Sequence, residues 1–132
     1  MASLKGIQLA AKLLRGKVLR TPIVYSPTFS KMSGCEVYLK LENLQMGGSF
    51  KIRGATYKIQ THLKDVQGKG IVAASVGNHA QGVAIAARAA GIPARVFMPT
   101  WVSLSKQEAT KSYGAEVVLE GNDLVESIDI AR

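Results

Sequence analysis

Four short apolar segments follow one another along the chain and predict the strands of a β-sheet. Residues 36–42 alternate polar and apolar side chains with a period of two, which is typical of a strand with one solvent-exposed face. Residues 70–76 and 94–98 are continuous apolar runs, as expected of strands covered on both faces. Residues 116–120 form a fourth, β-branched run, whereas residues 18–31 fit a strand, a loop or a mixture of both.

Helix-start and helix-stop signals separate these segments. A capping side chain precedes each expected helix, and three of the four are followed by Gln or Glu three residues later, as in a capping box. These capping residues are Ser49, Asn78, Ser105 and Asp123. Gly91 and Gly114 mark where the second and third of these helices end. A further helix over residues 3–14 precedes Thr21-Pro22, where proline favours extended backbone.

The alternation of strands and helices predicts an α/β fold, with a parallel sheet, flanking helices and right-handed crossovers. The helix expected from Asn78 is rich in alanine almost all round, so we expect it to pack closely against the sheet. The chain has 132 residues, of which 47% are hydrophobic and 20% charged, which fits one globular domain and argues against disorder. Cys35 is the only cysteine, which excludes a disulfide within the chain.

No apolar run approaches the ~18–20 residues that span a bilayer, and the N-terminus lacks a secretory pattern. We therefore expect a cytoplasmic protein with no membrane partner. The net charge is +8, and all of the excess lies before Gln67. Such a balance favours phosphate-bearing ligands, acidic partners or nucleic acid. Trp101 and the four tyrosines do not alternate with basic residues, which weakens the nucleic-acid interpretation.

A glycine pair and a lysine form the first motif that can carry chemistry, Gly47-Gly48-Ser49-Phe50-Lys51, between an expected strand and an expected helix. Adjacent glycines allow the backbone to approach a ligand, and a helix N-terminus favours an anion. A lysine in the first turn is unusual, because cations prefer the C-terminal end of a helix. Lys51 is therefore a candidate Schiff-base nucleophile. The alternative is an ordinary surface lysine after a glycine turn.

The second motif is Ser75-Val76-Gly77-Asn78-His79-Ala80-Gln81, where a buried strand is expected to lead into a helix. Loops at the carboxyl ends of parallel strands are where α/β proteins bind ligands. The backbone N–H groups of Gly77 and Asn78, with the side chains of Ser75 and Asn78, form a possible cradle for a carboxylate or phosphate. The alternative is that Asn78 only caps the helix and His79 lies on its surface.

The remaining candidates are weak. The sequence contains neither of the glycine-rich nucleotide-binding fingerprints. His62 and His79 have no metal-ligand spacing with each other or with Cys35, so we expect no metal site. His62 fits a solvated helix residue, and Cys35 has no thiolate-activating pattern around it.

Taken together, the motifs resemble the fold-type II pyridoxal-phosphate enzymes, which have a tryptophan-synthase-β-like fold. Residues 40–45 (KLENLQ) and 48–55 (GSFKIRGA) are similar to the lysine motif of this family, and residues 74–82 (ASVGNHAQG) to its asparagine loop. Arg20-Thr21-Pro22 and residues 111–118 also match the framework of the family. Within the family the likeness is greatest to the threonine dehydratases (threonine ammonia-lyases), with serine racemases and serine dehydratases nearby.

The resemblance implies a cofactor, pyridoxal 5'-phosphate, and a role for each motif. Lys51 would bind the cofactor covalently and move the α-proton of the substrate, with Phe50 packed beside the cofactor ring. Asn78 would hydrogen-bond the phenolic oxygen of the ring. The substrate carboxylate would lie against Ser75, Gly77, Asn78 and His79. The implied reaction is β-elimination of water from L-threonine or L-serine, which yields a 2-oxo acid and ammonia in amino-acid metabolism such as isoleucine biosynthesis.

Two departures from the family concern the neighbourhood of the site. The family usually has threonine where Gly47 stands and alanine where Val76 stands. Members of the family are also longer, so the resemblance implies an incomplete α/β fold. Residues 1–45 would be the N-terminal start of the large domain, and residues 46–132 the small α/β domain, truncated in its last helix. We expect this fragment alone to be inactive, and the complete protein to be a homo-oligomer.

Alternatives to this hypothesis come from three classes. Within the family, the chain fits a serine racemase or another fold-type II lyase. Outside enzymology, it fits a truncated, non-catalytic module that binds a partner chain or serves in assembly. Binding of nucleic acid by the basic first half is the third class, and the missing stacking pattern disfavours it.

Overall fold

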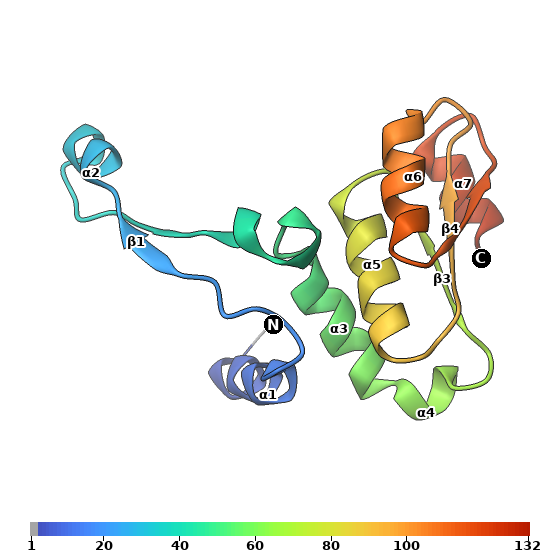
Figure 1. The fold of residues 1–132 in the computed structure, drawn as a ribbon, viewed down its shortest axis with the longest axis horizontal. Coiled ribbons are helices and arrows are strands. Elements are labelled where there is room, and N and C mark those ends of the chain that lie inside the picture. Colours follow the sequence, from blue (N-terminus) through green and yellow to red (C-terminus); the bar gives the residue numbers. More distant parts are fainter. Residues whose placement is uncertain (1–2) are drawn as a thin grey trace.

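The fold centres on a three-stranded parallel sheet, in a computed structural model that describes residues 3–132. Its strands, in spatial order, are β3 (Ile71–Ala74), β4 (Ala94–Met98) and β5 (Glu116–Leu119). Helices α5 (Asn78–Ala89) and α6 (Leu104–Ser112) connect successive strands and lie on one side of the sheet, and α7 (Leu124–Ile130) lies on the other (Figure 1). This arrangement confirms the predicted α/β fold with a parallel sheet and flanking helices.

The N-terminal part forms a separate antiparallel ribbon. Its elements are α1 (Leu4–Leu14), β1 (Ile23–Tyr25), α2 (Pro27–Ser33) and β2 (Tyr38–Lys40). Strand β1 pairs with β2, with Val24 opposite Leu39, and this ribbon extends away from the parallel sheet (Figure 1). The strand expected at residues 36–42 is therefore shorter than predicted and lies outside the parallel sheet. Helix α2 reverses the direction of the chain, so β2 pairs with β1 rather than with the parallel sheet.

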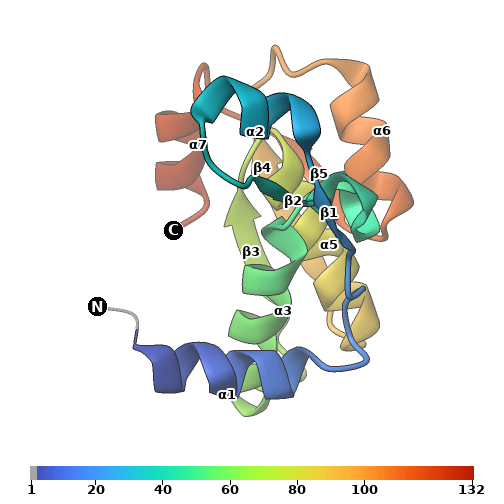
Figure 2. The same ribbon diagram turned by 90° about the vertical axis from the view of Figure 1, so that its left-hand side faces the viewer.

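Two short 3₁₀ turns, η1 (Glu42–Leu44) and η2 (Met46–Gly48), lead from this ribbon into α3 (Lys51–Thr61), which α4 (Leu63–Val66) follows. Figure 2 shows α1 crossing below α3. The helix α3 packs along α5, so the two helices that begin at the two sequence motifs are neighbours. This packing is the part of the fold that positions the candidate site.

Only some of the predicted helix starts are correct. The side chain of Asp123 accepts a hydrogen bond from the Glu126 N–H at 2.9 Å, which confirms the cap of α7. The predictions for Asn78 and Ser105 are wrong, because each lies inside its helix while Gly77 and Ser103 occupy the cap positions. Ser49 precedes α3 by two residues, and its hydroxyl accepts the Lys51 N–H at 3.4 Å.

The predicted helix ends and the alanine-rich core are confirmed. Gly91 and Gly114 have positive φ angles directly after α5 and α6. Helix α5 is buried on almost all sides, and its alanines pack with Val96 and Met98 of β4. The expectation that residues 70–76 and 94–98 are covered on both faces is wrong, because Val72 of β3 is 55% exposed and Arg95 of β4 is exposed as well. No helix within residues 3–132 has the length and apolarity needed to cross a membrane.

A half-buried ion pair joins α3 to the N-terminal part. The guanidinium of Arg53 donates from Nε and Nη2 to the two carboxylate oxygens of Glu42, at 2.9 and 2.7 Å. The Thr21 hydroxyl also donates to Glu42, and Arg53 Nη2 donates to the Leu19 carbonyl at 3.1 Å. These hydrogen bonds, that of Arg53 above all, hold the pKa of Glu42 at about 2, against an ordinary 4.5.

We predict that Glu42→Gln lowers the free energy of unfolding by roughly 2 kcal/mol at pH 7, because the amide cannot replace the charge-assisted bidentate pair. Since folding lowers the pKa of Glu42, its contribution is complete above pH 4.5 and disappears as the pH falls towards 2. Urea unfolding at several pH values, followed by circular dichroism, measures this. Glu116→Gln is the control, because its pair with Arg95 is exposed and contributes little. Equal losses for both variants would contradict the prediction.

Candidate functional site

The amine of Lys51 is accessible at the start of α3. Lys51 is the first residue of the helix, and its Nζ lies 5.2 Å from the centroid of the Phe50 ring. Both side chains are exposed, Phe50 to 57%. None of the ion pairs found within residues 3–132 involves Lys51. The amine is therefore free to react or to bind an anion, beside an aromatic face that offers a stacking surface.

The loop between β3 and α5 carries the second set of candidates. The Ser75 N–H donates to the carbonyl of Phe97 at 3.2 Å, which fixes the loop to the end of β4. Gly77 occupies the N-cap position, where no side chain caps the helix, and Asn78 and His79 form the first turn. The first N–H groups of a helix have no partner within it, so this end of α5 is suited to a carboxylate or phosphate.

The motif that contains Lys51 and the motif that contains His79 lie close together in the structure. Burial is the larger cause that lowers the pKa of His79, and the positive charge of Lys51 is the second. A Cβ atom on Gly82 of α5 would lie 3.1 Å from the carbonyl carbon of Lys51, so the start of α3 packs against the first turns of α5, near His79. Of the predicted residues, Phe50 and Lys51 thus come from one helix start, and Ser75, Gly77, Asn78 and His79 from the other.

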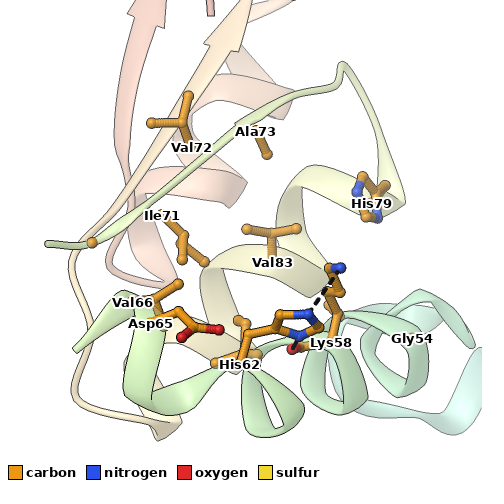
Figure 3. A pocket seen from close by; sticks show the side chains of 13 residues that line it. Gly54, Lys58, His62, Asp65, Val66, Ile71, Val72, Ala73, His79 and Val83 are labelled. Carbon is orange, nitrogen blue, oxygen red and sulfur yellow. Dashed lines mark hydrogen bonds between the residues drawn. The ribbon is translucent and has the colours of Figure 1, made fainter. Parts of the chain in front are cut away.

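A cavity of about 490 Å³ lies beside this site, between β3, α3 and the start of α5. Figure 3 shows Val83 and Ile71 facing it, with His79 at one side and Lys58 and His62 below. His62 is exposed and interacts with its own helix, through Lys58 and Thr61, as expected of a solvated residue. No group of three residues within 3–132 could hold a metal, and Cys35 is exposed.

The contacts of two residues in this neighbourhood, Arg53 and Gly47, were not predicted from the sequence. Arg53 lies two positions after Lys51 and forms an ion pair with Glu42, which joins α3 to the N-terminal part. The signal in the sequence was the opposite charge of these two residues on neighbouring segments. Gly47, singled out for ligand approach, has a φ of +73°, and a Cβ there would lie 2.8 Å from Cδ1 of Ile85. The positive φ angle, which glycine adopts readily and threonine rarely does, gives the departure from threonine a physical reason.

The chain belongs to the family of pyridoxal-phosphate dependent enzymes, whose model matches residues 14–132. It is 49% identical over 131 residues to an L-threonine ammonia-lyase of Thermotoga maritima, which covers 99% of this chain and 33% of that protein. The chain therefore spans about a third of the length of the curated relatives it matches.

Solved structures agree with this assignment. The structure of maize serine racemase superposes with a TM-score of 0.90 at 34% identity, over 98% of this chain and 40% of that one. The processed form of threonine deaminase isoform 2 from Solanum lycopersicum gives 0.84 at 31% identity, over 99% of this chain and 37% of that one. The predicted family and fold are thereby confirmed, and the chain corresponds to one part of a larger enzyme fold.

We predict that Lys51→Met raises the pKa of His79, because the substitution removes the nearby positive charge. The pKa should remain below the ordinary value, because burial, the larger cause, is unchanged. A titration followed by NMR of the histidine rings measures the change, and His62→Gln assigns the signals of the two histidines. Lys58→Met is the matched control on the same helix. An unchanged His79 pKa in Lys51→Met would contradict the proximity of Lys51 and His79.

Proposed function

We propose that the protein to which this chain belongs eliminates water from L-threonine and L-serine with pyridoxal 5'-phosphate, releasing a 2-oxo acid and ammonia. One observation carries the proposal: a free lysine amine beside an aromatic ring lies next to an anion-binding loop. The identity of 49% to an L-threonine ammonia-lyase supports threonine as substrate. Because the chain spans a third of that relative, the reaction is assigned to the complete protein.

The residues present fit this cofactor. Lys51 offers an unpaired amine for a covalent bond to its aldehyde carbon, and the exposed Phe50 ring offers a face for the pyridine ring. Asn78, the first residue of α5, would hydrogen-bond the phenolic oxygen of the cofactor. When bound, the cofactor supplies an electron sink that stabilises negative charge at the substrate α-carbon.

The remaining steps belong to side chains of this chain. The substrate carboxylate is held at the positive N-terminal end of α5 by Ser75, Gly77, Asn78 and His79. Binding there orients the α-proton of the substrate towards Lys51. Lys51 then accepts that proton as a general base. Since the pKa of His79 is lowered, its ring stays neutral around pH 7 and adds no second positive charge beside the amine.

We further propose the division into residues 1–45, at the start of the large domain, and residues 46–132, the small domain. The position of the β1–β2 ribbon, apart from the parallel sheet, supports this division (Figure 1). Exposed apolar side chains of α1, Leu4, Ile7 and Leu9 among them, support burial against other polypeptide, in the complete protein or in a homo-oligomer. We assign the protein to the cytoplasm and to amino-acid metabolism such as isoleucine biosynthesis.

Serine racemisation is the second candidate, and the TM-score of 0.90 to maize serine racemase favours it. Both reactions begin with removal of the α-proton, so the same Lys51 serves either. They differ in whether the hydroxyl group leaves. Supplying L-serine and measuring pyruvate and D-serine in one reaction separates them, and the proposal requires pyruvate to predominate.

We predict that a fusion of this chain to the part of the Thermotoga maritima relative that it does not match releases 2-oxobutanoate from L-threonine. Lys51→Ala in the fusion should reduce the rate by at least ~10³-fold, because it removes both the covalent attachment and the base. Lys58→Ala, on the same helix, is the control and should retain activity. Equal activity of the Lys51→Ala fusion would overturn the proposed function.

We also predict that borohydride reduction in the presence of pyridoxal phosphate attaches the cofactor to Lys51 of the fusion. Peptide mass spectrometry identifies the labelled lysine directly, independently of turnover. The other lysines of the chain act as internal controls, because each presents an amine without the neighbouring loop. Labelling at another lysine, or none at Lys51, would count against the assignment.

A further inference from the structure

Helix α5 packs tightly against the start of α3 at Gly82. A Cβ atom at position 82 would lie 3.0 Å from the backbone nitrogen of Ile52 and 3.1 Å from the carbonyl carbon of Lys51. Both are backbone atoms, which cannot rotate away as the end of a side chain can. Gly82 is buried and Ile52 is only 1% exposed, so this contact lies in a closely packed part of the core.

A second contact supports the same segment from its other side. Gly47 lies four residues before Lys51, and a Cβ there would lie 2.8 Å from Cδ1 of Ile85 on α5. The short stretch that carries Ser49, Phe50 and Lys51 therefore rests on α5 both before and after the lysine. Gly54, further along α3, is different, because a Cβ there meets nothing within 4 Å.

This packing determines how far Lys51 lies from the anion-binding loop. Asn78 and His79 form the first turn of α5, and Gly82 follows one turn later on the same helix. Because the helix is rigid, a displacement at Gly82 also changes the distance between the first turn of α5 and the start of α3. The distance between the amine and the loop thus depends on the absence of a side chain at position 82.

We propose that Gly82 is a positioning residue: by omitting a side chain, it holds the backbone of Lys51 against α5 and so sets the distance from the amine to the loop 75–79. This inference deepens the proposed function and rests on it for its catalytic meaning. The distance can be tested without cofactor or substrate, because His79, on the loop side, responds to the charge of Lys51.

The experiment uses the 132-residue chain and NMR titration of the His79 ring. Besides Lys51, the titratable groups that share the adjoining cavity with His79 are Lys58, His62 and Asp65, and His62→Gln is present in every variant. Gly82→Ala should raise the His79 pKa, and Gly82→Val should raise it further, because each larger side chain separates Lys51 from the loop. The rise in Lys51→Met measures the full effect of losing that charge.

Three controls separate positioning from a general loss of packing. Gly54→Ala adds the same methyl group to α3 in open space and should leave the His79 pKa unchanged. Ala84→Gly loosens α5 without adding an atom near Lys51, and should lower the melting temperature but not move the pKa. In the Lys51→Met background, Gly82→Ala should cause no further rise, because the charge through which it acts is gone.

Two results would overturn the proposal. One is an unchanged His79 pKa in a folded Gly82→Ala variant when Lys51→Met raises it. The other is an equal rise for Gly82→Ala with and without Lys51, which would assign the effect to exposure of His79 alone. Either result leaves the proposed function standing, since cofactor attachment at Lys51 tests that function separately. Circular dichroism confirms that each variant is folded, and Gly82→Ala is the deciding variant if Gly82→Val unfolds.

Discussion

The contact between α3 and α5 is the constraint on which the candidate site depends. Small side chains cover α5, where Ala80 and Ala84 are almost fully buried, and the helices approach to backbone contact at Gly82. Lys51 is the first residue of α3 and Asn78 is the first residue of α5, so the packing of the two helices brings the two sequence motifs together. Neither motif alone defines a site, because an exposed lysine and a helix N-terminus are both common features of protein surfaces.

A second contact limits how α3 can move against α5. Arg53 follows Lys51 by two residues and therefore lies on a different face of α3. Its guanidinium donates hydrogen bonds to the Glu42 carboxylate and to the Leu19 carbonyl. The start of α3 is therefore held between α5 and the N-terminal segment. The Glu42 side chain is only 17% exposed, so solvent screens this pair less than the exposed pair of Arg95 with Glu116. Arg53, which joins α3 to the N-terminal segment, thus lies only two residues after Lys51, the proposed cofactor-binding residue.

The sequence predicted the elements of the parallel sheet and the two motifs of the site, because hydrophobic period and glycine position are local properties. It failed at the caps of α5 and α6, since the actual caps, Gly77 and Ser103, are also residue types that favour this position. The pairing of β2 with β1 was missed because three-residue strands carry no signal of their partner. The importance of Gly82 was also missed, although a glycine inside a helix is a sign of close packing.

The excess positive charge of the chain is unevenly distributed relative to the candidate site. All of the +8 excess lies before Gln67, in the part that includes Lys51 and the N-terminal ribbon. Among these basic groups, Arg53 is paired with Glu42, whereas the amine of Lys51 lies 5.2 Å from the centroid of the Phe50 ring and takes part in none of the ion pairs found within residues 3–132. Nucleic acid requires a broad basic surface with stacking aromatic residues, and the sequence has no such stacking pattern. The proposed ligands, an amino acid and a phosphorylated cofactor, fit the unpaired charge of Lys51, whereas most of the other basic residues before Gln67 lie outside the candidate site.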